Sequence, residues 1–383
     1  MKYCKKCLQP DTRPGIKFDE NQICYACKYE DKKNKYIDWT KREAELKEIA
    51  DWAKKEANKR NTYDAVIGVS GGKDSTFQAI YAKEKLGLNV LLVNSTPDCI
   101  TEIGRHNLDN LANWGFDLIQ MRPNPKICKK LAKESFYRFG NIVKPSEYCL
   151  WASAYIIADK FNIPLIIQGE NAVQTLGTAN TAQEDNSDAF GVVNLNTLGG
   201  CRAKDLCFDD ITLKDLFMYE FPDIEKCRAK GIKAIYLQSY AKEWSQIKNA
   251  SFSIARGLWC RDREDLHDLG RYRRYNSLDS DFASVNQMIK YYKFGFGITT
   301  DEACYDIREG YLTREDAIWL INEYDGKCGE QYIEQFCKYI NITKDEFWNV
   351  VDTFVNKKLF TKLGQGIYKK NFTVGEDFNE HNI

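Results

Sequence analysis

Six consecutive residues have the types and the order of a phosphate-binding loop: Ser70, Gly71, Gly72, Lys73, Asp74 and Ser75. They follow residues 63–69, whose apolar, β-branched side chains predict a buried parallel strand. They precede residues 76–86, whose apolar spacing predicts a helix. A strand that ends in Gly-Gly and continues as a helix presents backbone N–H groups and the positive end of the helix dipole at one point. The stretch is therefore predicted to bind phosphate groups. The alternative is a serine-rich turn that caps an ordinary helix.

Four cysteines near the N-terminus have the spacing of a metal site: Cys4, Cys7, Cys24 and Cys27, two C-x2-C pairs with sixteen residues between them. Four thiolates complete a tetrahedron around zinc and leave no open position, so the metal would be structural. A pair of disulfides and an iron–sulfur cluster are the alternatives. The chain has fourteen cysteines and no secretory signal, which predicts reduced thiols in a cytoplasmic protein.

The elements that must position the loop alternate along the chain. Further strands are predicted at residues 89–93, 116–121, 164–168 and 232–237, and helices at residues 103–114, 126–139 and 146–161. Such alternation predicts an α/β fold with a doubly wound parallel sheet, whose ligand lies at the carboxyl ends of the strands. Ser70, Asn94 and Gly169, which follow three of the strands, should then share one crevice, with Glu170 and Asn171 beside them.

The rest of the chain predicts further parts around this sheet. We expect a four-cysteine zinc knuckle at residues 1–35, a linking helix at 36–60, the α/β domain at 61–275 and a helical region at 276–383. Residues 172–210 read as a long polar loop, either functional or a surface excursion. Helices are expected at residues 212–230 and 240–258. Capping boxes are expected at Thr40, Thr299 and Thr343.

Charge and hydropathy exclude some classes of function. Lysine plus arginine and aspartate plus glutamate number 55 each, which argues against a nucleic-acid partner, since phosphate backbones favour a basic excess. No apolar stretch is long enough to span a bilayer, and the first residues contain no signal-peptide core. We therefore expect no membrane span.

The sequence Ser-Gly-Gly-Lys-Asp-Ser resembles the PP-loop of the ATP pyrophosphatases, which cleave ATP between the α- and β-phosphates and adenylate their substrate. The loop differs from a Walker loop, which ends in Gly-Lys-Ser/Thr after a longer spacer. The resemblance implies that Ser70, Gly71, Gly72 and Ser75 hold the pyrophosphate of ATP. It assigns Asp74 to Mg²⁺ or to ordering the loop, and makes Lys73 a further candidate catalytic residue. Asn94 and Gly169 are the nucleotide-binding candidates at the neighbouring strand ends.

Three further stretches are similar to the N-acetyl sugar amidotransferases: the cysteine knuckle with residues 16–24, the segment 163–171, and the tail between residues 292 and 315. Members of that family act in lipopolysaccharide, O-antigen or nonulosonic acid biosynthesis, including that of pseudaminic and legionaminic acid. They convert an acetamido group of a nucleotide-linked sugar to an acetamidino group. The resemblance covers nearly the whole chain. Ile298 stands where a basic residue is expected, which would change the sugar if that position meets the substrate.

The chemistry implied by the resemblance is adenylation of the acetamido oxygen followed by displacement of AMP by ammonia. Glu170 is the candidate for orienting ammonia or magnesium, and Asn171 for hydrogen bonding to the sugar amide. The chain contains three histidines and no recognisable glutaminase triad, so a separate glutaminase subunit is expected to supply ammonia. A basic run would meet the phosphates of the sugar nucleotide or form a solvated face: Arg256, Arg261, Arg263, Arg271, Arg273 and Arg274.

Two other functions remain open at this point. A PP-loop tRNA thiolase would need two or three cysteines close to the loop, drawn from Cys99, Cys128, Cys149, Cys201 and Cys207. A non-enzymatic nucleotide sensor would bind ATP without releasing pyrophosphate.

Overall fold

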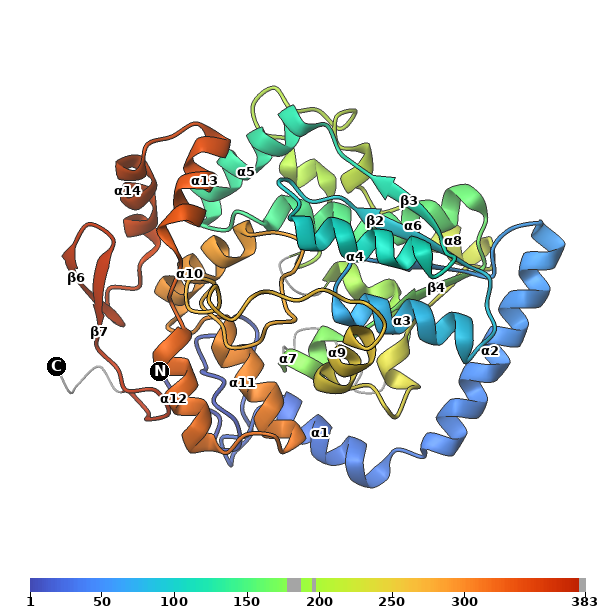
Figure 1. The fold of residues 1–383 in the computed structure, drawn as a ribbon, viewed down its shortest axis with the longest axis horizontal. Coiled ribbons are helices and arrows are strands. Elements are labelled where there is room, and N and C mark those ends of the chain that lie inside the picture. Colours follow the sequence, from blue (N-terminus) through green and yellow to red (C-terminus); the bar gives the residue numbers. More distant parts are fainter. Residues whose placement is uncertain (178–186, 195–197, 379–383) are drawn as a thin grey trace.

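The computed structural model describes residues 1–177, 187–194 and 198–378, and its centre is one open parallel sheet (Figure 1). The strand order is β3-β2-β1-β4-β5, and every neighbouring pair is parallel. The strands are β1 (Ala65–Gly68), β2 (Val90–Ser95), β3 (Asp117–Met121), β4 (Leu165–Gln168) and β5 (Lys233–Tyr236). The predicted α/β fold with a parallel sheet is confirmed. Because the strand order reverses between β1 and β4, the residues after these two strands flank the position where such sheets bind ligands.

Helices cover both faces of the sheet. The helices of this part are α3 (Lys73–Glu84), α4 (Glu102–Asn113), α5 (Pro125–Phe139), α6 (Lys144–Phe161), α7 (Ala172–Leu176), α8 (Ile224–Ala229) and α9 (Gln246–Ile254). Successive strand residues point to opposite faces. Val66 and Ile166 therefore join the hydrophobic cluster of α6, whereas Ile67 and Ile167 join that of α3. This two-sided burial explains why the strands are almost uniformly apolar.

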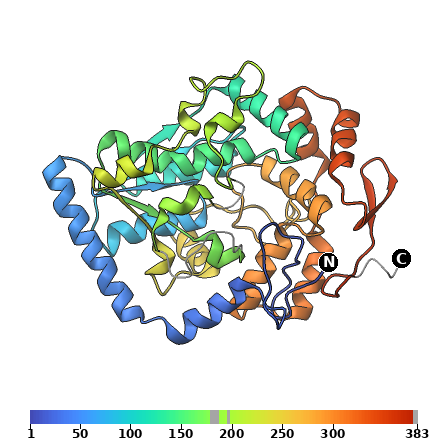
Figure 2. The same ribbon diagram turned by 180° about the vertical axis from the view of Figure 1, so that it is seen from behind.

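Two N-terminal helices, α1 (Tyr25–Tyr36) and α2 (Trp39–Arg60), run along the outer edge of the molecule from the cysteine-rich segment to the sheet (Figure 1, Figure 2). Leu46 and Ala53 of α2 are buried against the sheet helices. The capping box predicted at Thr40 is wrong. The cap is Asp38, whose carboxylate accepts a hydrogen bond from the backbone N–H of Lys41.

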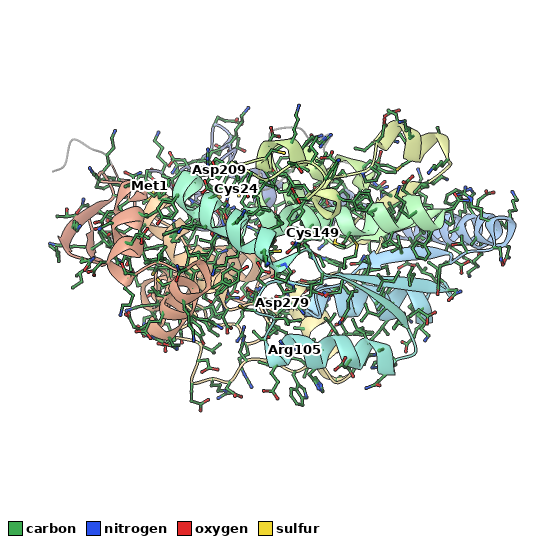
Figure 3. All side chains as sticks on the ribbon, turned by 90° about the horizontal axis from the view of Figure 1, so that it is seen from above. Met1, Cys24, Arg105, Cys149, Asp209 and Asp279 are labelled. Carbon is green, nitrogen blue, oxygen red and sulfur yellow. The ribbon has the colours of Figure 1, made fainter. Side chains whose placement is uncertain are left out.

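The C-terminal part is helical and ends in a hairpin that the sequence did not predict. Its elements are α10 (Phe282–Phe294), α11 (Ile298–Glu309), α12 (Arg314–Tyr324), α13 (Glu330–Ile340), α14 (Lys344–Phe354), β6 (Phe360–Gly364) and β7 (Ile367–Lys370). These helices share one hydrophobic cluster with Cys4, Cys7, Cys24 and Cys27. Seen from above, Cys24 lies on the side of the C-terminal helices, away from the far end of the sheet (Figure 3).

Several predicted elements differ from the observed ones. Residues 212–230 contain a short 3-10 helix at Phe217–Tyr219 and then α8, because Pro222 lacks the N–H that a continuous helix requires. Residues 240–258 are helical only in α9. The cap predicted at Thr299 is wrong, since α11 begins one residue earlier and its first N–H groups are bound by Asp325.

The predicted polar loop at residues 172–210 lies partly outside the described residues, which omit 178–186 and 195–197. Its described parts include α7 and two 3-10 helices, Ala189–Asn194 and Ala203–Leu206. Phe190, Val192 and Leu206 are buried in the cluster around α6. These described parts therefore belong to the core and are no surface excursion.

No helix in the described part of the chain combines the length and the apolar character needed to cross a membrane.

Candidate active site

The loop after β1 is held by its own serines. The hydroxyl of Ser75 accepts a hydrogen bond from the N–H of Ser70 (3.4 Å) and donates one to the carbonyl of Gly72 (3.1 Å). Helix α3 begins at Lys73, earlier than predicted, and no side chain caps it. Gly71 has φ +78°, and a Cβ there would lie 3.2 Å from the carbonyl oxygen of Gly104 in α4. The first turn of α3 thus offers backbone N–H donors to an anion.

Helix α9 holds the charged pair at the start of α3. The Lys73 ammonium lies 2.7 Å from Oδ2 of Asp74, and the amide of Asn249 donates a hydrogen bond to Oδ1 of Asp74 (2.9 Å). Ser253 donates to the carbonyl of Lys73 (2.8 Å). The Lys73 side chain is buried, with its ammonium 5.7 Å from the centre of the Tyr275 ring. Asp74 is fixed on both oxygens, so this pair is preorganised.

Glu170, which follows β4, lies beside this pair. Burial raises the pKa of its carboxyl group to about 7; the charge of Asp74 also raises it, whereas the charge of Lys73 lowers it. The hydroxyl of Tyr305 donates to Oε2 of Glu170 over a long 3.5 Å, and Gln246 contributes a second hydrogen bond. The structure therefore brings together the three candidate catalytic residues, two from the start of α3, which follows β1, and one from the residues after β4.

Three other candidate residues are engaged within the protein. The buried amide of Asn94 donates to the carbonyl of Val69 (2.8 Å), so it braces β2 against β1. A Cβ at Gly169 would lie 3.0 Å from the Trp244 ring, which explains the glycine by close packing. Asn171 is buried, and its backbone N–H donates to Gln238 (3.0 Å). Their assigned roles in nucleotide and sugar binding stay predictions.

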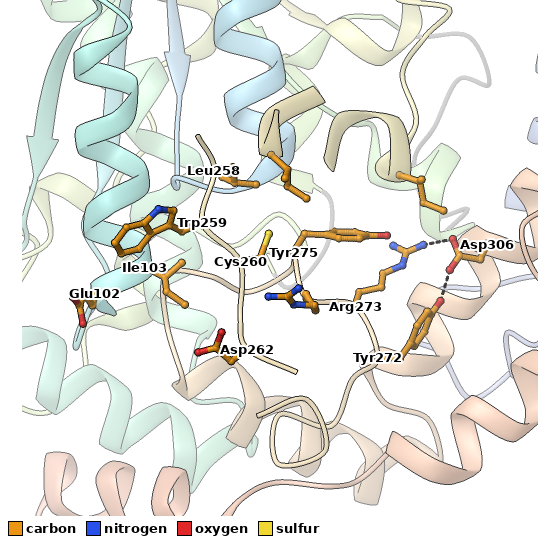
Figure 4. A pocket seen from close by; sticks show the side chains of 13 residues that line it. Glu102, Ile103, Leu258, Trp259, Cys260, Asp262, Tyr272, Arg273, Tyr275 and Asp306 are labelled. Carbon is orange, nitrogen blue, oxygen red and sulfur yellow. Dashed lines mark hydrogen bonds and ion pairs between the residues drawn. The ribbon is translucent and has the colours of Figure 1, made fainter. Parts of the chain in front are cut away.

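A cavity of about 870 Å³ is lined by Tyr275, whose ring centre lies 5.7 Å from the Lys73 ammonium; residues 70–75 do not line it (Figure 4). It lies between α4, α9, the irregular segment 258–275 and α11. Arg273 forms an ion pair with Asp306, which also accepts a hydrogen bond from Tyr272, and Arg273 donates to Gln246. The lining residues are Glu102, Ile103, Ile247, Ile254, Leu258, Trp259, Cys260, Asp262, Tyr272, Arg273, Arg274, Tyr275 and Asp306.

Half of the basic run lies inside the protein. Arg261, Arg271 and Arg273 are buried, which excludes a solvated face for these three. Burial lowers the pKa of Arg271. Arg271 forms an ion pair with Glu302, with 3.7 Å between the guanidinium nitrogen and the carboxylate oxygen. Arg273 and Arg274 line the cavity, so two members of the run are placed to meet an anionic ligand.

The four N-terminal cysteines form a compact, fully buried cluster, with sulfur atoms within 4.8 Å of one another. The Cys7–Cys24 and Cys4–Cys27 sulfur distances are 3.7 and 3.9 Å, too long for disulfide bonds. A buried set of four thiols fits a tetrahedral zinc ion. Arg314 of α12 donates to the carbonyl of Cys4 (2.9 Å), which ties the cluster to the C-terminal helices.

The comparison with protein families decides the biological setting of the C-terminal part. Residues 269–372 match the family described as LPS biosynthesis protein WbpG-like, C-terminal domain. The match indicates a role in lipopolysaccharide or sugar biosynthesis and an enzyme of that biosynthesis. No curated protein matches the chain.

The matched residues 269–372 contribute to the site as well as to the fold. Tyr272, Arg273 and Tyr275 line the cavity from the start of this range, and Tyr305 contacts Glu170 from α11. The sequence did not identify Tyr275, Tyr305 or Gln246 as site residues. The only indication would have been the arginine- and tyrosine-rich composition of residues 271–275.

Two of the cysteines that a thiolase would use, Cys128 and Cys149, have hydrogen-bond partners within the protein. The Cys128 sulfur is 3.2 Å from the hydroxyl of Tyr219, and Cys149 forms a hydrogen bond with Ser95. Both line a cavity of about 50 Å³ whose walls do not include residues 70–75. Cys99 is exposed on the loop after β2.

Proposed function

We propose that this chain is an ATP-dependent amidotransferase that converts the acetamido group of a nucleotide-linked sugar to an acetamidino group. The observation that carries the proposal is the convergence of Lys73, Asp74 and Glu170 at the uncapped start of α3, next to a large cavity. The match to an LPS biosynthesis family supports a sugar as the substrate. The chemistry needs no nucleophile from the protein.

ATP would bind with its outer phosphates at the loop. The backbone N–H groups at the start of α3 and the hydroxyls of Ser70 and Ser75 would donate to the pyrophosphate. Lys73 would exchange its contact with Asp74 for a phosphate oxygen, which frees Asp74 for Mg²⁺. A magnesium ion there would neutralise charge on the departing pyrophosphate.

The reaction would proceed in two steps. The acetamido oxygen attacks the α-phosphorus of ATP, and pyrophosphate leaves with the electrons of the broken phosphorus–oxygen bond. The oxygen is now part of AMP, a good leaving group. Ammonia then attacks the former amide carbon, and AMP departs. Glu170, whose pKa of about 7 lets it exchange a proton near neutral pH, is placed to accept one from ammonium.

The large cavity would hold the sugar nucleotide. Trp259 is about half exposed, and its indole stacks on His106 with 3.5 Å between ring centroids and an interplanar angle of 12°. Such a supported aromatic face suits stacking on a nucleobase or a sugar. Arg274, whose Nε donates to the carbonyl of Arg261, directs a cation toward the same space.

A direct assay tests the proposal. Purified protein is incubated with ATP, magnesium, ammonium and a panel of diacetamido sugar nucleotides, and products are analysed by mass spectrometry. We expect AMP, pyrophosphate and a sugar nucleotide with the mass change of an O-to-NH exchange. Release of ADP and orthophosphate, or no amidine from any acceptor, would contradict the proposal.

A matched pair of variants locates the chemistry. Asp74→Asn should lower the rate by about a thousandfold or more, because the site loses the charge that orders Lys73 and binds magnesium. Asp51→Asn, on the exposed side of α2, removes the same charge at a distance and should leave the rate unchanged. Equal rates for both variants would remove the loop from the mechanism.

A further inference from the structure

A second opening, separate from the large cavity, leads toward Glu170 from the side of α1 and α2. Its outer part is a hollow of about 520 Å³. The hollow lies between these two helices, the segment 242–248 and the end of α11. Its walls include Glu30, Lys33, Trp39, Lys242, Glu309 and Tyr311. Acidic and basic side chains both line it, so it carries no strong field of one sign.

The inner part of this opening is very small. A space of about 20 Å³ shares Lys33, Trp244 and Glu309 with the outer hollow and reaches Glu170. Its other walls include Gln174, Thr175, Gln246 and Tyr305. A cavity needs roughly 10–15 Å³ to hold one water molecule. The inner space therefore has room for about one molecule of that size.

The opening and the large cavity share no lining residue. Helix α9 stands between them, since Ile247 lines the cavity whereas Gln246 lines the inner space. Arg273 of the cavity wall donates a hydrogen bond to Gln246. One pair of side chains thus separates a space large enough for a sugar nucleotide from one that fits a single small molecule.

We propose that this opening, lined by Glu30, Lys33, Trp244 and Glu309 outside and by Gln174, Thr175, Gln246 and Tyr305 inside, is an ammonia passage that ends at Glu170. The inference rests on the proposed function and adds the route by which the nitrogen arrives. Ammonia and ammonium have the size of water, so they fit the inner space, whereas ATP and the sugar nucleotide do not.

The passage ends where the proton must be removed. Ionised Glu170 takes one proton from ammonium, which leaves neutral ammonia and a neutral carboxyl group. The nitrogen lone pair forms a bond to the adenylated amide carbon. The carbon–oxygen bond to AMP breaks, and its electron pair leaves with AMP. The attacking nitrogen releases one proton to solvent, and the product is an amidinium ion that carries the former amide proton and two of the ammonia protons.

The size of the inner space can be tested by gain of function. Methylamine is a stronger nucleophile than ammonia but carries an additional methyl group. We expect the wild-type enzyme to use ammonia and to discriminate against methylamine. Gln174→Ala removes a wall of the inner space and should improve the methylamine-to-ammonia ratio of kcat/KM about tenfold or more. Thr175→Ala enlarges the same space by less and should act in the same direction if the first variant does not fold.

The control variant changes a residue of α9 that lines the large cavity and not the passage. Ile247→Ala enlarges the large cavity and, whatever it does to the KM of the acceptor, should leave the methylamine-to-ammonia ratio unchanged. The passage is overturned if the wild-type enzyme uses methylamine as well as ammonia, if neither Gln174→Ala nor Thr175→Ala alters the ratio, or if Ile247→Ala alters it instead. Absence of any amidine from the whole acceptor panel in the wild-type enzyme overturns the proposed function itself, so the two failures are distinguishable.

Discussion

Two carboxylates, Glu170 and Asp301, are placed in opposite electrostatic surroundings. Asp301 of α11 accepts hydrogen bonds from Gln9 (2.7 Å) and Lys290 (2.7 Å) and forms an ion pair with Arg13. Burial alone would raise the pKa of Asp301, but the two cations lower it to about 2. Glu170 is partly exposed, and both burial of its carboxyl group and the charge of a second carboxylate, Asp74, raise its pKa to about 7.

The difference separates a structural role from a functional one. The Asp301 cluster joins Gln9 and Arg13 of the cysteine-rich segment to α10 and α11, and its single carboxylate is paired with two cations, Arg13 and Lys290. At Glu170 the strongest neighbouring charge is that of another carboxylate, Asp74, and Lys73 offsets it only in part. Lys33 and Arg308 line the small space on the other side of Glu170. Ammonium and magnesium, the two cations of the proposed reaction, would add positive charge beside the two carboxylates. A carboxylate whose strongest neighbouring charge has the same sign marks a candidate site more strongly than burial alone.

The largest effect is expected from removing the negative charge of Asp301 from its cluster with Arg13 and Lys290. Asp301→Asn leaves Arg13 and Lys290 buried without their counter-charge, and the free energy of unfolding should fall by about 3–5 kcal/mol. Urea denaturation followed by circular dichroism measures it. Asp109→Asn, at an exposed position of α4, is the matched control and should change the free energy of unfolding by less than about 0.5 kcal/mol. A similar loss for both variants would show that the cluster is not what stabilises α11.

The contribution of the same cluster to the free energy of unfolding should also decrease at low pH. Because the folded pKa of Asp301 lies below its unfolded value, its contribution to stability is present above the unfolded pKa and is lost as pH falls toward about 2.

Glu170 should behave with the opposite sign. Its folded pKa is raised above the unfolded value, so its contribution to stability is present below the unfolded pKa and is lost as pH rises through about 7. The shift corresponds to about 3 kcal/mol. Glu170→Gln cannot ionise, and in the absence of ligands it should be more stable than wild type at pH 8 by about that amount while its amidine formation is lost.

Unfolding free energies of both proteins from pH 4 to pH 9 measure this. A Glu170→Gln variant that is destabilised at every pH would show that Glu170, like Asp301, is a structural carboxylate.

The sequence predicted the local parts of this site and not the remote ones. The loop, β1 and α3 are adjacent in the chain, so the glycines and the apolar run were sufficient to predict them. Gln246 and Tyr305 reach Glu170 from 76 and 135 residues away, and nothing in their neighbours indicates that contact. Distance also explains the cap of α11, where Asp325, from beyond α12, replaces the locally predicted Thr299.

The hairpin of β6 and β7 was not predicted from the sequence, for a different reason. In β6 only Phe360 is buried and the next three residues are exposed, so the apolar alternation that indicates a strand is missing. By contrast, Thr343 caps α14 and accepts a hydrogen bond from the N–H of Glu346 (3.1 Å), because that interaction depends on neighbouring residues only. This half of the predicted capping box is observed, whereas the Glu346 carboxylate accepts a hydrogen bond from the distant Tyr137.

The smallest expected effect comes from Tyr305, whose hydroxyl gives Glu170 one weak stabilising contact at 3.5 Å. Tyr305→Phe removes a donor to the ionised carboxylate, so the pKa of Glu170 should rise further, by less than one unit, or roughly 0.5–1 kcal/mol. The pKa of Glu170 is read from the pH at which the free energy of unfolding of wild type falls below that of Glu170→Gln. The same comparison, made with both proteins also carrying Tyr305→Phe, gives the shift. Tyr311→Phe, an exposed tyrosine after α11, is the control and should leave that pH unchanged. A shift in the opposite direction would mean that Tyr305 accepts a hydrogen bond from a protonated Glu170. Glu170 would then be held by partners within the protein, as Asp301 is.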